Sequence, residues 1–188
     1  MSKMSEIKNS IIIFAVFTII FGLVYPLVIT GISQLAFPSQ ANGELIKENG
    51  QIIGSQLIGQ NFSSPQYFQG RPSVIDYNAS TSSGSNLGPD NQHLINNVSQ
   101  RMQLIIQEDS LPVNVSVPAD LVEASSSGLD GNIYVDSAMI QVPRIAQARN
   151  ISQSEVNKIV IDNEEFQLLG NPIVNVLKLN IALDKLNK

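Results

Sequence analysis

Cysteine is absent from this 188-residue chain, and histidine occurs once, as His93. Without cysteine the chain can form neither disulfide bonds nor thiolate metal sites, so core packing must hold the fold together. A transition-metal centre needs several histidine or cysteine ligands, and the sequence does not supply them. Asp120, Asp130 and Asp136 lack the regular alternation of a calcium loop, and we interpret them as solvated turn acids. The sequence predicts no metal site.

Motifs of two common enzyme classes are also missing. The phosphate-binding pattern G-x-x-x-x-G-K-[ST] does not occur, nor does the G-x-S-x-G elbow that carries a nucleophilic serine. A Ser/His/Asp triad would have to use His93, which lies in a predicted helix among Asn and Gln residues. We interpret His93 as a solvent-facing helix residue and predict no catalytic residue.

Charge is missing over a long stretch near the N-terminus, between Lys8 and Glu44. Within it, Ile11 to Phe37 is rich in Ile, Val, Leu, Phe and Ala, and as a helix it would reach roughly 40 Å, enough to cross a bilayer core of about 30 Å. A signal peptide has a shorter apolar run and a small-x-small cleavage site, and a buried core helix has a polar face. The run therefore predicts an uncleaved transmembrane helix at residues 11–37, in which Pro26 interrupts the helix and Gly31 allows close approach of another helix.

The flanks of this helix predict its orientation. Lys3 and Lys8 precede it, and residues 39–43 carry no charge, so the positive-inside rule places residues 1–10 in the cytoplasm at the plasma membrane. Residues 38–188 then form one extracytoplasmic domain of ordinary size. The chain has 16 acidic and 11 basic residues, a formal charge of −5, which argues against nucleic acid as a partner.

Local patterns predict a mixed α+β domain. Glu44 to Ile58 reads as a β-hairpin around Asn49-Gly50, and a helix runs from Asp90 or Asn91 to about Glu108. Strands are expected at Val113 to Val117 and at Leu121 to Ala124. A helix is expected from about Asp136 to near Arg149, broken or restarted at Pro143, and a second helix is capped by Ser152 or Ser154. A strand from Val174 to Leu179 and a tail helix from Ile181 to Leu186 complete the expected elements. The fold class is thus a single N-terminal transmembrane helix plus one mixed α+β extracytoplasmic domain.

Two stretches rich in Ser and Gly punctuate the domain, Asn78 to Pro89 and Ser125 to Gly131. The first is interpreted mainly as a flexible linker. The alternative is a shaped loop whose backbone amides bind a ligand.

Short motifs occur in a fixed order over most of the chain. They are Gly54–Gln60 (GSQLIGQ), Tyr67–Ser73 (YFQGRPS), Tyr77-Asn78, Ser83–Pro89 (SGSNLGP), Ser127–Asp130 (SGLD), Val142–Ala146 (VPRIA), Ala148-Arg149 and Val174–Asp184 (VNVLKLNIALD). In this order they resemble the C subunit (KdpC) of the Kdp-type potassium-transporting P-type ATPase. One departure is visible, because the family usually has Pro and His after S-G-L-D, where this chain has Gly131 and Asn132 and so a more flexible turn.

The resemblance implies a non-catalytic accessory subunit of a high-affinity, ATP-driven potassium uptake complex, needed for assembly and activity. The family's partners are a channel-like potassium-translocating subunit, a P-type ATP-hydrolysing subunit and a small single-helix subunit, beside membrane lipid. The family is also described as a catalytic chaperone that raises the ATP affinity of the pump subunit. This chain lacks the D-K-T-G phosphorylation motif, so ATP and potassium ion would be used by the complex, with no cofactor bound by this chain alone.

Candidate partner-contact residues come from the helix and from these motifs. They are Pro26, Gly31, Gly70, Arg71, Pro72, Ser127, Gly128, Asp130, Arg144 and Arg149. An alternative function is a membrane-anchored extracytoplasmic ligand-binding or sensor domain that uses the Ser/Gly loops. A third is an anchored hydrolase centred on His93.

Overall fold

A computed structural model describes residues 3–112 and 114–186, in two units of which the first ends at Leu45 and the second begins at Ile46. Met1 and Ser2, in the expected cytoplasmic N-terminus, and Val113, in the first expected strand, lie outside the described residues. Each unit is described by itself.

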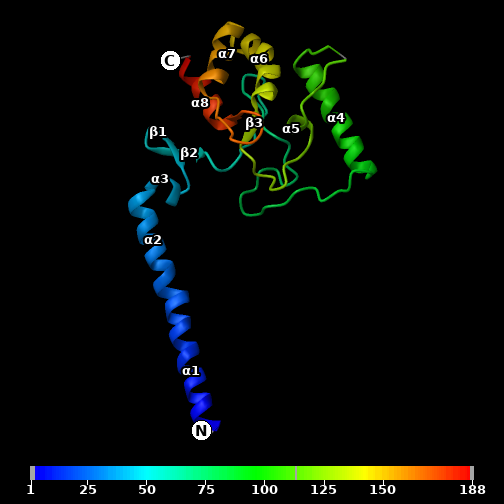
Figure 1. Ribbon diagram of the computed structural model, residues 1–188. Helices are drawn as coiled ribbons and strands as arrows, with labels where there is room; N and C mark the ends of the chain where they lie inside the picture. Colours follow the sequence, from blue (N-terminus) through cyan, green and yellow to red (C-terminus); the bar gives the residue numbers. More distant parts are fainter. Residues whose placement is uncertain (1–2, 113, 187–188) are drawn as a thin grey trace. The chain divides into compact units, whose positions relative to one another are not determined.

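The first unit is a long apolar helix. It consists of α1 (Lys3–Ile19), a π-helical turn η1 (Ile20–Val24) and α2 (Tyr25–Ala36), and a short helix α3 (Pro38–Ala41) follows (Figure 1). The 34 residues from Lys3 to Ala36 are long and apolar enough to cross a membrane. The predicted apolar helix is therefore present, and it begins before Ile11.

Pro26 does not break this helix. In a regular α-helix its ring would collide with the carbonyl of Gly22, and its missing N–H would leave that carbonyl without a donor. The chain instead widens just before the proline, where the Tyr25 N–H donates to the carbonyl of Ile20, five residues back. A π turn of this kind is a recognised response to local strain in a helix. The predicted interruption at Pro26 takes this form.

The second unit begins with the predicted hairpin. Strands β1 (Leu45–Glu48) and β2 (Gln51–Ser55) pair across Asn49 and Gly50, which have φ angles of 50° and 81°. Two left-handed residues in succession are what a two-residue type I′ turn requires, and Asn-Gly is the pair that adopts them most readily. The expectation of a hairpin is confirmed.

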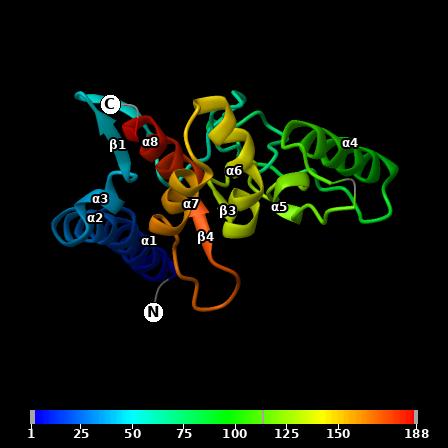
Figure 2. The ribbon, with the colours of Figure 1, turned by 90° about the horizontal axis from the view of Figure 1, so that it is seen from above.

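A small sheet and three helices form the core of the second unit. β3 (Asn132–Tyr134) and β4 (Ile173–Asn175) are antiparallel, with Ile133 opposite Val174, and each runs directly into a helix: α6 (Val135–Arg149) follows β3 and α8 (Val176–Leu186) follows β4. Helix α7 (Gln153–Asp162) packs against both (Figure 2). The buried apolar side chains that meet here are Phe68, Ile133, Ala138, Val142, Ile145, Ala146, Val156, Ile159, Val160, Val174, Val176, Leu179 and Leu183.

Helices α4 (Gln92–Glu108) and α5 (Ala119–Val122) pack against one another beside this core, and α5 also contacts β3. The α4 prediction is confirmed, with Asn91 as the N-cap whose side chain accepts the His93 N–H.

Four local expectations are wrong. The strand expected at Leu121 to Ala124 is occupied by α5, because Pro118 serves as its N-cap, and residues 114–117 form no strand. Pro143 lies inside α6 without ending it. The strand expected at Val174 to Leu179 stops at Asn175, where α8 starts.

An irregular segment, Pro65–Gln69, is fixed by side chains instead of by a strand ladder, and we call it the clamped segment. The side-chain amide of Asn180 in α8 bonds both backbone groups of Phe68, at 2.8 and 3.0 Å. The amide of Gln141 in α6 does the same for Gln69, at 2.8 and 3.1 Å. Each amide thus supplies one acceptor and one donor, as a neighbouring strand would.

Two arginines of α6 complete the clamp. Arg144 donates to the carbonyls of Pro65 and Tyr67, at 2.7 and 3.1 Å, and Arg149 donates to the carbonyl of Gln66 at 2.7 Å. The backbone of the clamped segment is therefore held to α6 and α8 at every residue.

The clamp predicts a large effect of Asn180→Ala. Asn180 is 2% exposed, and its loss leaves the buried N–H and C=O of Phe68 without partners. Because each such group costs about 1–3 kcal/mol, we expect the free energy of unfolding to fall by about 2–4 kcal/mol. Thermal or denaturant unfolding of the full chain measures this. Asn97→Ala, at an exposed α4 position without a side-chain hydrogen bond among the described residues, is the matched control. Equal stability of the two variants would contradict the clamp.

Candidate functional site

Two motif segments far apart in the sequence meet at one place beyond the clamped segment. The Arg71 guanidinium pairs with the Asp130 carboxylate at 3.3 Å, and the Ser73 hydroxyl donates to the Gly128 carbonyl at 2.7 Å. The structure thereby brings together six of the predicted site residues, namely Gly70, Arg71, Pro72, Ser127, Gly128 and Asp130. The clamped segment fixes where Gly70 and Arg71 lie, because Gly70 directly follows its last residue, Gln69.

Tyr77 fixes the turn that carries Arg71. Its hydroxyl donates to the Arg71 carbonyl, and its backbone N–H donates to the Ser73 hydroxyl at 2.9 Å. A Cβ on Gly59 would lie 2.8 Å from the Tyr77 ring, so the glycine leaves room for that ring. Burial raises the pKa of the Tyr77 phenol, and the nearby Asp130 carboxylate adds to the effect. Tyr77 therefore remains a neutral hydrogen-bond donor.

The Ser125–Gly131 turn is held closely by its neighbours. Gly128 has a φ of 70°, and a Cβ there would lie 2.6 Å from the Ile75 side chain and 2.9 Å from the Ser83 carbonyl. The Ser83 N–H donates to the Ser127 carbonyl at 3.0 Å, so the first Ser/Gly stretch packs on the second at this point. This stretch is a shaped loop there, and its interpretation as a flexible linker is wrong.

The departure from the family pattern at Gly131 does not loosen the turn. The Gly131 carbonyl accepts the Val176 N–H at 2.9 Å, and the Asp130 carboxylate accepts the Asn132 N–H at 3.0 Å. The first bond joins the turn to the start of α8, and the second joins it to the first residue of β3.

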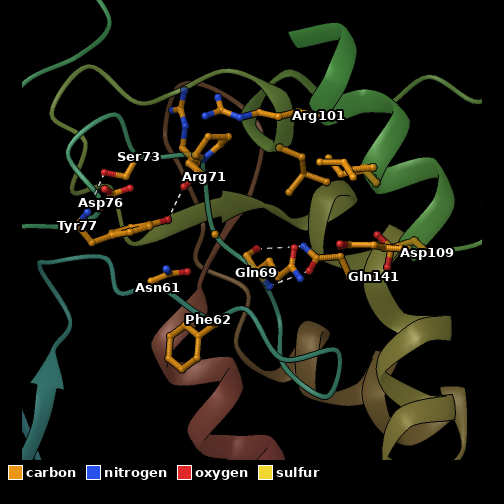
Figure 3. A pocket seen from close by; sticks show the side chains of 16 residues that line it. Asn61, Phe62, Gln69, Arg71, Ser73, Asp76, Tyr77, Arg101, Asp109 and Gln141 are labelled. Atoms are coloured by element: carbon orange, nitrogen blue, oxygen red, sulfur yellow. Dashed lines mark hydrogen bonds between the residues drawn. The ribbon is translucent and has the colours of Figure 1, made fainter. Parts of the chain in front are cut away.

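A pocket of about 300 Å³ lies between the Gly70–Tyr77 segment, α4 and α5 (Figure 3). Arg71 and Tyr77 contribute to one side, and Gln69 and Gln141 of the clamp line another. Helix α4 contributes Arg101, Leu104, Ile105 and Glu108, and Leu121 of α5 completes the apolar part. No local pattern in the sequence indicates Arg101, because its place in the pocket depends on how α4 packs.

Beside the pocket lies a buried ion pair. The Nε atom of Arg144 lies 2.7 Å from Oδ1 of Asp109, and the two side chains are 7% and 4% exposed. Burial raises the pKa of the Asp109 carboxyl, and the Arg144 charge opposes that shift. Arg144 also donates to the Gln141 side chain at 2.8 Å, so the charge pair and the amide clamp share one network.

The remaining predicted site residues lie elsewhere. Arg149 is engaged within the domain, stacked 4.9 Å from the Tyr67 ring centroid and paired with Asp184 at 2.8 Å. Arg144 is likewise engaged within the domain. Pro26 and Gly31 belong to the first unit, where a Cβ on Gly31 would meet nothing within 4 Å. A partner contact by any of these residues stays a prediction.

The arrangement offers hydrogen bonding and ion pairing, and we find no catalytic constellation in it. His93 is exposed in the first turn of α4, and its side chain makes no hydrogen bond among the described residues. Over residues 3–112 and 114–186, no group of three His, Cys, Asp or Glu side chains could hold a metal ion.

Comparison with known proteins gives a consistent result. The sequence model of a family described as "K+-transporting ATPase, c chain" matches residues 7–185. A protein of Mycobacterium bovis BCG named "Potassium-transporting ATPase KdpC subunit" is 49% identical over 176 residues, which cover 91% of this chain and 93% of the relative. Proteins with the same name from Herminiimonas arsenicoxydans and Burkholderia orbicola are 49% and 47% identical, covering 96% and 95% of this chain and 98% and 95% of the relatives.

The close fit of the Ser/Gly turn predicts that Gly128→Ala is destabilising. The left-handed φ alone costs a residue with a Cβ about 1–2 kcal/mol, and the overlap with Ile75 and Ser83 adds to that. We expect the free energy of unfolding to fall by about 2 kcal/mol or more. Gly131→Ala in the same turn is the matched control, because its nearest contacts are 3.4 Å away, and it should cost less than about 1 kcal/mol. Denaturant unfolding of both variants compares them, and equal losses would show that the turn is loosely packed.

Proposed function

Because the chain belongs to the KdpC family, the c chain of K⁺-transporting ATPases, we propose that it holds the subunits of a potassium uptake pump together. It is an accessory subunit and not the catalytic one, and its sequence lacks the D-K-T-G phosphorylation motif. One observation carries the proposal. A helix of membrane-spanning length is joined to a domain that presents an apolar loop, with no catalytic constellation among the described residues.

That loop, Phe166–Gly170, connects α7 to β4, and we call it the apolar loop. Phe166, Leu168 and Leu169 are 84%, 86% and 91% exposed. Its base is fixed, because Glu165 and Ile173 exchange backbone hydrogen bonds at 2.8 and 3.3 Å. Large apolar side chains held out in this way are typical of protein contact sites. We propose that the apolar loop contacts another subunit of the pump.

The partners we propose are those that the family resemblance implies. They are a channel-like potassium-translocating subunit, a P-type ATP-hydrolysing subunit and a small single-helix subunit. ATP and potassium ion are used by these partners, and this chain binds no cofactor on its own. In the membrane, Pro26 and Gly31 lie where another helix could pack closely.

The proposed topology has the N-terminus in the cytoplasm and the mixed domain outside. The chain is a transporter subunit with a helix suited to single-pass anchoring, and Lys3 and Lys8 flank the apolar stretch on its N-terminal side. Residues 1–10 are then cytoplasmic, residues 11–37 span the membrane and residues 38–188 lie outside. ATP is on the cytoplasmic side, so the catalytic-chaperone role described for the family, raising the ATP affinity of the pump subunit, would have to act through the membrane helix.

The proposed topology predicts the outcome of proteolysis. Protease added to spheroplasts should degrade the domain after residue 38 and leave a tag at the N-terminus intact, because the membrane shields it. Immunoblots against the tag and the domain measure this. Permeabilised spheroplasts, in which both should be cut, are the control. Loss of the tag from sealed spheroplasts would reverse the orientation.

The apolar loop predicts the outcome of Leu168→Ser combined with Leu169→Ser. Both side chains are exposed, so the stability of the isolated chain should change by less than about 0.5 kcal/mol per site. Burial of each leucine in an interface stabilises it by about 1.5–3 kcal/mol, so co-purification of the other subunits should fall at least about tenfold. Leu57→Ser, at a side chain that is 59% exposed and outside the loop, is the control. Undiminished co-purification and potassium-stimulated ATPase activity would remove the loop from the proposal.

A further inference from the structure

The pocket has a cationic end made by two arginines from different parts of the chain. Arg71 comes from the loop after the clamped segment, and Arg101 comes from α4. Arg71 donates to the carbonyl of Glu123 at 3.5 Å and Arg101 to the carbonyl of Val122 at 3.4 Å. The two acceptor carbonyls belong to consecutive residues, and Figure 3 shows the side chains of Arg71 and Arg101 next to one another.

The two arginines differ in their ion pairing. Arg71 pairs with Asp130 at 3.3 Å, whereas Arg101 forms no ion pair among the described residues. The Nε atom of Arg71 is buried and makes no hydrogen bond. Burial lowers the pKa of Arg101, which reflects the cost of holding its charge out of water. Arg71 thus has a carboxylate partner at this end of the pocket, and Arg101 has none within ion-pair distance among the described residues.

The rest of the pocket limits what could neutralise that charge. Pro72, Leu104, Ile105 and Leu121 supply apolar walls. Asp76 and Glu108 also line the pocket, with exposed side chains, and together with Asp130 they would repel an ion that carries two negative charges. Asp109 is occupied by Arg144. The fitting ligand carries one negative charge, accepts hydrogen bonds from a guanidinium and has a short apolar body.

We propose that this pocket binds a carboxylate on a short apolar stem, paired with Arg71 and Arg101. A carboxylate accepts the planar, forked donors of a guanidinium, and Arg101 has no ion-pair partner among the described residues. The carboxylate belongs to a small organic acid in the surrounding medium or to a side chain or C-terminus of another chain. The site stands apart from the apolar loop and does not depend on it.

Butyrate is the probe for the site, and butyramide is its neutral counterpart of similar shape. Calorimetric titration of the full chain in detergent, at constant ionic strength, should show saturable binding of butyrate and none of butyramide. Arg101→Gln should weaken butyrate binding at least about tenfold. Lys158→Gln, which removes a cation from an exposed pair with Asp162, is the matched control and should bind butyrate as the unaltered chain does.

A second variant guards against misfolding of Arg101→Gln. Leu104 is 54% exposed and lines the pocket, so Leu104→Glu adds a competing carboxylate without burying it. It should abolish butyrate binding while the unfolding temperature stays near that of the unaltered chain. Absence of saturable butyrate binding, equal binding of butyramide, or undiminished binding by Leu104→Glu would overturn the proposal.

Titration of the purified pump complex distinguishes the two sources of the carboxylate. If a partner chain supplies it, the pocket is filled in the complex, which then binds no butyrate, and Leu104→Glu weakens co-purification of that partner. If a small organic acid supplies it, the complex binds butyrate as tightly as the isolated chain does, and Leu104→Glu leaves assembly unchanged. Either result, together with binding by the isolated chain, supports the carboxylate site.

Discussion

The structure of the second unit depends on one constraint. The clamped segment Pro65–Gln69 has a buried backbone and no neighbouring strand to bond it. Phe68 is fully buried, so its backbone groups need partners that water cannot supply. Side-chain amides from α6 and α8 provide them, and two arginines bond the carbonyls of the preceding residues. Because Gly70 and Arg71 follow without a break, the same bonds fix the position of the pocket. The domain has no cysteine, and polar side chains here connect distant segments as a disulfide could.

A buried charge accompanies this clamp. Replacing a buried ion pair by apolar residues is often neutral or stabilising, so the Arg144–Asp109 pair is weak grounds for stability in itself. The role of the pair follows from the other hydrogen bonds of Arg144. The Arg144 guanidinium also donates to two carbonyls of the clamped segment and to the side chain of Gln141. An apolar replacement could fill the same volume but would leave those acceptors unsatisfied. We infer that the pair is kept for the specific arrangement it imposes.

The features that the sequence predicted correctly are set by neighbours in the chain. The apolar helix follows from composition, the hairpin from Asn49-Gly50, and the start of α4 from its cap at Asn91. Errors arose around prolines: strands were expected on both sides of Pro118, which is the N-cap of α5, and a break was expected at Pro143, which lies within α6. The sequence indicated residues 70–73 and 127–130 only as separate motifs of one family, and their contact in space was not predicted. The place of Arg101 was missed, because it depends on the packing of α4 and on no local pattern.

Arg71 links the pocket to the rest of the domain. Arg71 belongs at once to the loop that follows the clamp and, through Asp130, to the turn that precedes β3. A ligand that binds the folded domain and not the unfolded chain stabilises the fold by mass action, and its effect centres on the segments it contacts. An anion in this pocket would therefore tighten both segments together. Were a neighbouring subunit to supply that anion, assembly of the pump and ordering of this site would be a single equilibrium. In the isolated subunit Arg101 would keep a partly buried charge without an ion-pair partner among the described residues.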